Sequence, residues 1–390
     1  MRSAAHTLLH PLDRLAAAWA EHFGLGAPRA FFAPGRVNLL GAHLDYNEGF
    51  VLPMAVDRGT YVLAAPRADR RVRLHSLDRQ PTVEADLDRL VLEASHGWAN
   101  YPKGVLAAFG RDVPGLDLLY CGDLPIGAGL SSSASILVAT ATAANAFAAR
   151  ERSRIELVHL CRGAEVNFVG VKCGIMDHYA SAFGREGHVL HLDCRSITHR
   201  EVPFDGSKAT IVVCDTTKRR ENSDGRFNDR VRECGEAVAR LRELGVPAGA
   251  LRDVDRATLE RYRGRIPEIP YRRALHVVSE IERTIRGVQA LDAGDFEAFG
   301  AWLRDSHESS RVHYEVSSRE LDALVEAVHG APGAYGARLT GAGFGGCCVA
   351  VVRPDAVEAF RAVVAEKYEA ATGLQPRLHP FHPSRGATAL

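Results

Sequence analysis

The chain has 390 residues, of which 46% are hydrophobic, and its 48 lysines and arginines balance 48 aspartates and glutamates. This length exceeds one ordinary hydrophobic core and favours two domains, 1–205 and 206–390, divided at the polar turn PFDGSK. The balanced charge excludes a general attraction to nucleic acid or to an anionic membrane, so we expect small-molecule partners.

Helices and strands are predicted in alternation along the whole chain. Helical spacing of apolar residues predicts a first helix over 8–24. Alternating or continuous apolar runs then predict strands within 60–76, in LDLLYCGDLP, and over 187–194 and 209–215. Further helices are expected over the ranges 134–150, 226–244, 273–292, 317–329 and 355–372. The mixture indicates an α+β protein.

The apolar segments are too short, or too rich in alanine and threonine, to cross a bilayer. Asp13 and Glu21 interrupt the N-terminal segment where a signal peptide stays apolar. We therefore expect a cytoplasmic protein, and we take it to be a monomer. The eight cysteines show no CxxC spacing, which predicts buried thiols and neither a zinc site nor a disulfide framework.

The segment DLPIGAGLSSSASILVATATAANAF (123–147) combines glycines, three serines and an alanine-rich helix directly after a strand. Glycines permit close backbone approach, and the free N–H groups at a helix start favour an anion. The pattern therefore predicts a phosphate cradle. It lacks the lysine of a Walker A loop, and a serine-rich cap on an ordinary helix remains the alternative.

A second glycine-rich segment, RLTGAGFGGCCVAVV (338–352), contains a literal G-x-G-x-x-G. A dinucleotide-binding motif requires a helix after these glycines, whereas an apolar strand is predicted here. We therefore expect a structural loop whose backbone presses against a ligand or another loop. Its glycines are Gly341, Gly343, Gly345 and Gly346.

A third segment, GRVNLLGAHLDYNEG (35–49), places an arginine, a histidine and an aspartate close together. With the two glycine-rich segments, and with matches at 98–105, 164–196 and 306–325, the chain resembles the GHMP kinase superfamily and, within it, the galactokinase family. The resemblance implies a ribosomal protein S5-like N-terminal domain and a ferredoxin-like C-terminal domain, with the active site in the cleft between them. It also implies transfer of the ATP γ-phosphoryl group to the anomeric hydroxyl of a sugar, with Mg²⁺.

The resemblance assigns the catalytic base to Asp177 and its charged neighbour to Arg36. A carboxylate beside a guanidinium stays ionised at neutral pH and can accept a hydroxyl proton. The plain alternative for Asp177 is a helix N-cap. Ser133 and Glu165 match the Mg²⁺ positions, although Glu165 is also consistent with a solvated helix residue. The expected ATP-binding residues are Gly127, Gly129, Leu130, Ser131, Ser132 and Ser133, with Trp98 and Lys103 as candidates near the adenine.

The sugar-binding pattern of the family, G-E-H-T-D-Y, keeps its histidine and aspartate here as His43 and Asp45, and Gly174 is expected beside them. Three departures lie on the sugar side: Ala42 replaces the glutamate, Phe227 replaces a tyrosine, and His178 replaces a glutamine.

The lost glutamate would accept a hydrogen bond worth ~1.5–3 kcal/mol from the sugar C6 hydroxyl. A glutamate about 4 Å from a C6 carboxylate would instead cost about 4 kcal/mol at an effective dielectric near 20, so Ala42 would suit a uronate. Arg219 and Arg220 offer a partner for such a carboxylate, although surface charge explains them equally well.

We expect a sugar 1-kinase acting on galactose or a galacto-configured sugar, with galacturonate the favoured refinement and arabinose the alternative. A sensor that binds sugar and ATP without turnover is disfavoured, because the SSSAS run, Arg36 and Asp177 are all present. A lipid-pathway kinase is weakened by His43 and Asp45, which suit a polyol.

Overall fold

The computed structural model describes residues 10–24, 26–125, 127–218 and 223–390. Its largest sheet has six strands in the order β13-β1-β3-β6-β4-β5, and only β4 and β6 pair in parallel. The strands are β1 (Arg29–Asn38), β3 (Pro53–Arg67), β4 (Arg71–Ser76), β5 (Val83–Asp86), β6 (Gly115–Gly122) and β13 (Thr388–Ala389).

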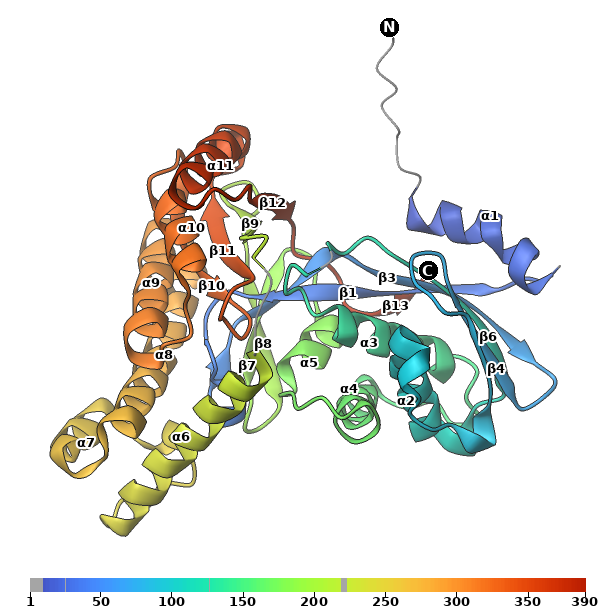
Figure 1. Ribbon diagram of the computed structural model, residues 1–390, viewed down its shortest axis with the longest axis horizontal. Coiled ribbons are helices and arrows are strands. Elements are labelled where there is room, and N and C mark those ends of the chain that lie inside the picture. The colour runs from blue at the N-terminus through green and yellow to red at the C-terminus, as the bar shows by residue number, and fades with distance from the viewer. Residues whose placement is uncertain (1–9, 25, 126, 219–222) are drawn as a thin grey trace, which may run out of the picture.

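Helices cover both faces of this sheet (Figure 1). Helix α1 (Pro11–Phe23) packs on β6 and β3 through Leu15 and Trp19. The opposite face carries α2 (Asn100–Phe109), α3 (Ser132–Asn145), α4 (Arg154–Gly163) and α5 (Met176–Phe183). Because the central strands are buried on both sides, they read as long apolar runs.

A second sheet of four antiparallel strands, in the order β10-β11-β9-β12, forms the other half of the molecule. It comprises β9 (Thr210–Asp215), β10 (Ala334–Thr340), β11 (Cys347–Val352) and β12 (Arg377–Phe381). Alternate residues of β11 face opposite sides, so Val349 joins one apolar cluster with α9, and Ala350 joins another with α10 and α11. The helices of this half are α6 (Ser223–Glu243), α7 (Arg256–Arg261), α8 (Glu268–Asp292), α9 (Phe296–Ser309), α10 (Arg319–His329) and α11 (Val357–Thr372).

A small sheet of β2 (Phe50–Val51), β7 (His188–Asp193) and β8 (Thr198–Pro203) lies at the boundary between the halves. The chain leaves this sheet at Pro203 and enters the four-stranded sheet at Thr210, close to the expected division at 205. The last strand, β13, returns to pair with β1, so residues 388–389 lie with the first sheet although the expected second domain includes them. The domain limits themselves stay a prediction.

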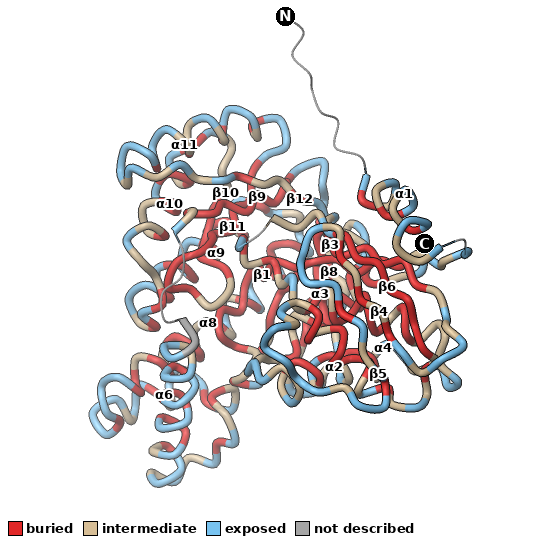
Figure 2. The backbone as a smooth tube through the Cα atoms, turned by 45° about the vertical axis from the view of Figure 1, so that its right-hand side comes forward, coloured by how far each residue is buried: buried red, intermediate tan, exposed pale blue. Residues whose placement is uncertain are grey.

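The structure confirms the mixed α+β class, and each predicted helix and strand has a counterpart. Buried residues follow the sheets and the inward faces of the helices, whereas α6 and α11 present exposed outer faces (Figure 2). Within the described ranges, no helix has both the length and the apolar character needed to cross a membrane.

Candidate active site

The three segments singled out in the sequence meet around one cavity of about 450 Å³ between the two halves. The first half contributes described residues from within 36–45, 124–125, 127–133 and 165–177, and the second contributes Phe227, Arg338, Gly341 and Ala342. A polar cavity between two packed halves is the usual place for a small-molecule site.

At this cavity Arg36 of β1 meets Asp177 of α5, although the two residues are 141 positions apart. The guanidinium donates two hydrogen bonds, from Nε to Oδ1 at 2.7 Å and from Nη2 to Oδ2 at 2.6 Å. Its Nη1 donates to the carbonyl of Gly129 at 2.9 Å, which ties the ion pair to the serine-rich segment. This two-point contact fixes the carboxylate in position as well as in charge.

Local backbone geometry makes this meeting possible. A register shift interrupts the pairing of β1 with β3 between Pro34 and Arg36. A Cβ on Gly35 would lie 2.7 Å from the carbonyl oxygen of Leu130, so only glycine lets the strand approach that loop. The Arg36 N–H then donates to the same carbonyl at 3.0 Å.

Asp177 is the second residue of α5, which begins at Met176, so it is not the N-cap. Burial raises the pKa of Asp177, but the Arg36 charge and the hydrogen bonds from Ser131 and Arg36 outweigh burial and hold the pKa below its usual value. The side chain keeps 28% exposure, enough to face a ligand in the cavity. Asp177 is therefore an ionised carboxylate pointing into the site.

The serine-rich segment forms a tight turn that leads directly into α3. Ser131 stands before the helix with φ 56°, and its hydroxyl donates to Asp177 Oδ2 and makes no cap hydrogen bond with α3. The alternative of an ordinary serine cap is therefore wrong for Ser131. Gly127, Gly129 and the three serines line the cavity, as does Leu130, whose side chain also packs in the core. The start of α3 thus offers an anion site beside Asp177.

A neighbouring cavity of about 510 Å³ shares Ser132 and Ser133 with the first and contains Trp98. Lys103 does not join Trp98 there. Its Nζ is buried 3.2 Å from Glu93 Oε1 and 2.7 Å from His96 Nδ1, so the expectation that it binds ATP is not supported by its position.

Asp45, which also lines the cavity, packs against Gly174. A Cβ on Gly174 would lie 1.9 Å from Asp45 Oδ2, so the glycine makes room for the carboxylate. Burial and the nearby charge of Asp177 raise the pKa of Asp45 to about 6. Two neighbouring carboxylates thus have pKa values shifted in opposite directions.

His43 lies beside Asp45 in the left-handed region, with φ 59°. Its Nδ1 is 3.0 Å from the Tyr46 hydroxyl, and its ring lies 5.8 Å from the ring of Phe227. Burial, with the charges of neighbouring basic groups, lowers the pKa of His43 to about 3, so the ring is neutral. Its buried Nε2 has no hydrogen-bond partner among the described residues. A neutral ring nitrogen beside the cavity can bind a ligand hydroxyl.

The backbone around Ala42 is anchored by a residue that the sequence did not reveal. The N–H groups of Gly41 and Ala42 both donate to Oε1 of Glu280 at 3.0 Å, and the Arg283 Nε donates to its Oε2 at 2.7 Å. Glu280 is fully buried on α8. Burial raises its pKa, but the charges of Arg283 and His276 outweigh burial and lower the pKa to about 2.

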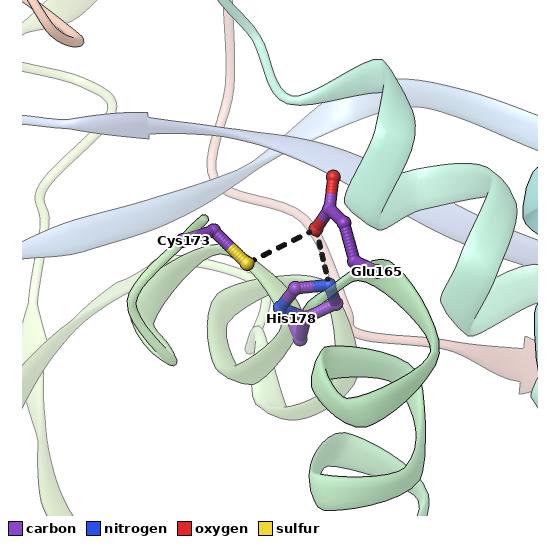
Figure 3. Close-up of side chains that lie close together, drawn as sticks. All are labelled: Glu165, Cys173 and His178. Atoms are coloured by element: carbon purple, nitrogen blue, oxygen red, sulfur yellow. Dashed lines mark hydrogen bonds and ion pairs between the residues drawn. The ribbon is translucent and has the colours of Figure 1, made fainter. Parts of the chain in front are cut away.

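Glu165 lies in a π-helical turn, Ala164–Val169, that follows α4. It is only 4% exposed, so the alternative of a solvated helix residue is wrong. Glu165 and Ser133 line the same cavity, and a carboxylate and a hydroxyl are oxygen ligands of the kind that Mg²⁺ prefers. The Nε2 atom of His178 lies 2.9 Å from Oε2 of Glu165 (Figure 3).

The glycine-rich loop connects two strands, β10 and β11, as expected, and not a strand and a helix. A Cβ on Gly343, which has φ 81°, would lie 2.2 Å from the Val316 carbonyl oxygen. Gly341, Gly345 and Gly346 also have positive φ, and Gly341 lines the cavity.

Arg219 and Arg220, the expected partners of a sugar carboxylate, lie outside the described residues.

Family models match three parts of the chain: the galactokinase galactose-binding signature at residues 17–66, the GHMP kinases N terminal domain at 100–185 and the GHMP kinases C terminal at 288–370. Galactokinases of Roseiflexus sp. and Chloroflexus aurantiacus are each 43% identical to the chain, and each alignment covers 94% of this chain. The alignments cover 94% of the Roseiflexus protein and 95% of the Chloroflexus protein.

Among solved structures, galactokinase of Lactococcus lactis complexed with galactose superposes with a TM-score of 0.92, at 35% identity, over 97% of this chain and 100% of that one. A mevalonate kinase shares the fold, with a TM-score of 0.63 at 18% identity. This superposition covers 92% of this chain and 99% of the mevalonate kinase chain. The chain has the two-domain GHMP kinase fold and belongs to the galactokinase family of ATP-dependent sugar kinases.

Proposed function

We propose that the chain is a galactose 1-kinase, which transfers the γ-phosphoryl group of ATP to the anomeric hydroxyl of galactose. The observation that carries this proposal is the Arg36–Asp177 pair, joined through Ser131 to the start of α3. A hydroxyl-activating carboxylate and a phosphate-binding helix start then face one cavity. The names of the relatives support galactose as the acceptor.

Asp177 accepts the proton of the anomeric hydroxyl as the new bond to phosphorus forms. Its lowered pKa makes it a weak base, which suits phosphoryl transfer because the hydroxyl proton need not leave early in a loose transition state. Arg36 holds the carboxylate in place and adds positive charge near the transferred group. Positioning and electrostatics therefore supply most of the rate enhancement.

Sugar hydroxyls are bound at the other end of the cavity by Asp45 and His43. Asp45 offers a carboxylate held in place by contact with Gly174, and His43 offers its unpartnered Nε2. Phe227, whose ring lies 5.2 Å from the ring of Tyr46, supplies an apolar wall. The Glu280 carboxylate fixes the backbone that carries these groups.

Ser133 and Glu165 would hold Mg²⁺, which neutralises charge on the ATP phosphates when bound. The fit rests on the donor set, a hydroxyl and a buried carboxylate on one cavity wall. The adenine would bind beside Trp98 in the neighbouring cavity, which the two serines connect to the phosphate site. A monomeric state and a cytoplasmic location stay predictions.

The comparisons do not favour the galacturonate or arabinose refinement, because the relatives they identify are galactokinases. A panel of galactose, galacturonate, arabinose and glucose, with ADP release followed in a coupled assay, tests the acceptor directly. We expect galactose to give the highest kcat/KM. A preference for galacturonate would overturn galactose as the acceptor and would restore the significance of Ala42.

The role of the carboxylate is tested by Asp177→Asn, which we expect to lower kcat by about 10²-fold or more. Asp117→Asn is a matched control, because Asp117 on β6 accepts the same two-point contact from Arg73 at 2.7 and 2.6 Å, outside the cavity. We expect the control to keep kcat for the folded protein. Full turnover by Asp177→Asn would contradict the proposed base.

A further inference from the structure

Three side chains of different types converge at the edge of the active-site cavity: Glu165, Cys173 and His178 (Figure 3). His178 Nε2 lies 2.9 Å from Glu165 Oε2, and Cys173 Sγ lies 3.4 Å from the same oxygen. One ligand atom of each residue lies within 4.8 Å of the other two. The residues come from the π-helical turn, from the loop before α5, and from α5 itself.

The environment of His178 is unusual for a buried ring. The side chain is fully buried, and neither ring nitrogen has a hydrogen-bond partner among the described residues. Nε2 is close to the Glu165 carboxylate but outside hydrogen-bonding geometry. Nearly all buried polar groups in native proteins are satisfied. The described contact of Nε2 is the ion pair with Glu165, and a cation between the three side chains would give this nitrogen a bonding partner.

The donor set selects the kind of cation. A nitrogen, a sulfur and a carboxylate oxygen do not suit Mg²⁺, which prefers hard oxygen ligands. Imidazole and thiolate suit Zn²⁺, which binds nitrogen and oxygen at about 2.0–2.2 Å and sulfur at about 2.3 Å. Three ligand atoms within 4.8 Å of one another are compatible with one ion at these distances.

We propose that Glu165, Cys173 and His178 bind Zn²⁺, or another thiophilic divalent cation, as three protein ligands with one position left to the cavity. Glu165 and Cys173 line that cavity, which gives the ion a route of entry. Binding replaces the thiol proton of Cys173 with the metal and releases the proton to solvent.

The proposed site differs from the sequence expectation that the chain has no zinc site. That expectation rested on the spacing of the cysteines and on their apolar surroundings, whereas only one cysteine takes part here. The histidine and the glutamate are 13 positions apart and come together only in the fold.

Occupation of this site also has a consequence for activity, and this part rests on the proposed function. Glu165 is the proposed ligand of the Mg²⁺ that accompanies ATP. An ion held by its Oε2 competes for that carboxylate, so Zn²⁺ inhibits the kinase, and added Mg²⁺ relieves the inhibition.

The binding test uses the full chain without nucleotide or sugar. Co²⁺ replaces Zn²⁺ as the optical probe, because a cobalt–thiolate bond gives a charge-transfer band in the near ultraviolet. We expect one equivalent of Co²⁺ to produce this band in the unmodified chain and Cys173→Ser to abolish it. Cys194→Ser is the matched control, because Cys194 is the other half-buried cysteine, and it keeps the band.

Zn²⁺ affinity is measured by competition with a chromophoric chelator. His178→Gln, which restores the residue of the family pattern and so is expected to fold, weakens Zn²⁺ binding at least about tenfold. Absence of the band in the unmodified chain, or an equal Zn²⁺ affinity in His178→Gln, overturns the site. A cobalt–thiolate band in a chain without sugar-dependent ADP release supports the site and overturns only the proposed function.

Discussion

Replacing Asp45 by asparagine should stabilise the protein at neutral pH while impairing sugar binding. Burial and the charge of Asp177 raise the pKa of Asp45 from 3.8 to about 6, so its ionised form is less stable in the folded chain than in the unfolded one. A carboxyl with a raised pKa contributes its full stability below about pH 4 and loses it as the pH rises through 6. The native protein tolerates this loss of stability at a position that we propose to bind the sugar.

The size of the effect follows from the two pKa values. The difference between 3.8 and about 6 corresponds to about 3 kcal/mol of unfolding free energy at pH 7. An asparagine side chain carries no charge at any pH, so the variant does not lose this stability on going from pH 4 to pH 7. The stability difference between Asp45→Asn and the unmodified chain should therefore grow by up to about 3 kcal/mol over this interval.

Urea unfolding followed by circular dichroism at pH 4, 5, 6 and 7 measures this difference. Subtracting the unmodified chain cancels the titration of distant groups, which the two proteins share. Asp305→Asn, on the exposed surface of α9, is the control and should show no such growth. A stability difference for Asp45→Asn that stays constant from pH 4 to pH 7 would refute the reasoning.

Three further changes test other parts of the site. A Cβ on residue 174 would lie 1.9 Å from Asp45 Oδ2, so Gly174→Ala should raise KM for the sugar by at least about tenfold without changing KM for ATP. Gly235→Ala is the control, because a Cβ there would lie in open space. Equal steady-state constants for the two variants would contradict the contact between Gly174 and Asp45. Glu280 has a pKa lowered from 4.5 to about 2, so its stability contribution is present above pH 4.5 and is lost as the pH falls toward 2. Glu280→Gln should therefore lower the unfolding free energy at pH 7 by about 3 kcal/mol, and a variant as resistant to urea as the unmodified chain would exclude this. Trp98→Ala should raise KM for ATP by about tenfold and leave KM for the sugar unchanged, and an unaltered KM for ATP would remove the adenine from this cavity.

The long, strongly patterned elements were predictable from the sequence, and the elements that depend on packing were not. The apolar run of β11 and the amphipathic spacing of α10 carry their own signals. Helix α2 was missed because it contains Pro102 and Gly104, residues typical of a helix break. The proline lies in the first turn, where it needs no N–H partner, and a Cβ on Gly104 would lie 3.1 Å from Phe168.

The site residues also divide into those predictable from local sequence and those that depend on packing. Arg36 and Asp177 were identified from local motifs, and the fold joins them directly. Glu280 was missed because a glutamate on an amphipathic helix looks like a solvent-facing charge, and its partners at Gly41 and Ala42 are more than 230 positions away. No pattern local to α8 indicates that contact.

The ion pair at Arg36 contributes to the pKa difference between the two carboxylates of the site. The guanidinium contacts Asp177 directly, so Asp177 stays ionised. Burial raises the pKa of Asp45, and the negative charge of Asp177 raises it further. Neighbouring carboxyls with shifted pKa values are a usual way for one site to assign two roles. Here the group with the lowered pKa accepts a hydrogen bond from Ser131, just before α3, and the group with the raised pKa belongs to the segment that resembles the sugar-binding pattern. We therefore expect removal of the Arg36 charge to alter the sugar binding proposed for Asp45 as well as the catalysis proposed for Asp177, although Arg36 makes no hydrogen bond to Asp45 among the described contacts.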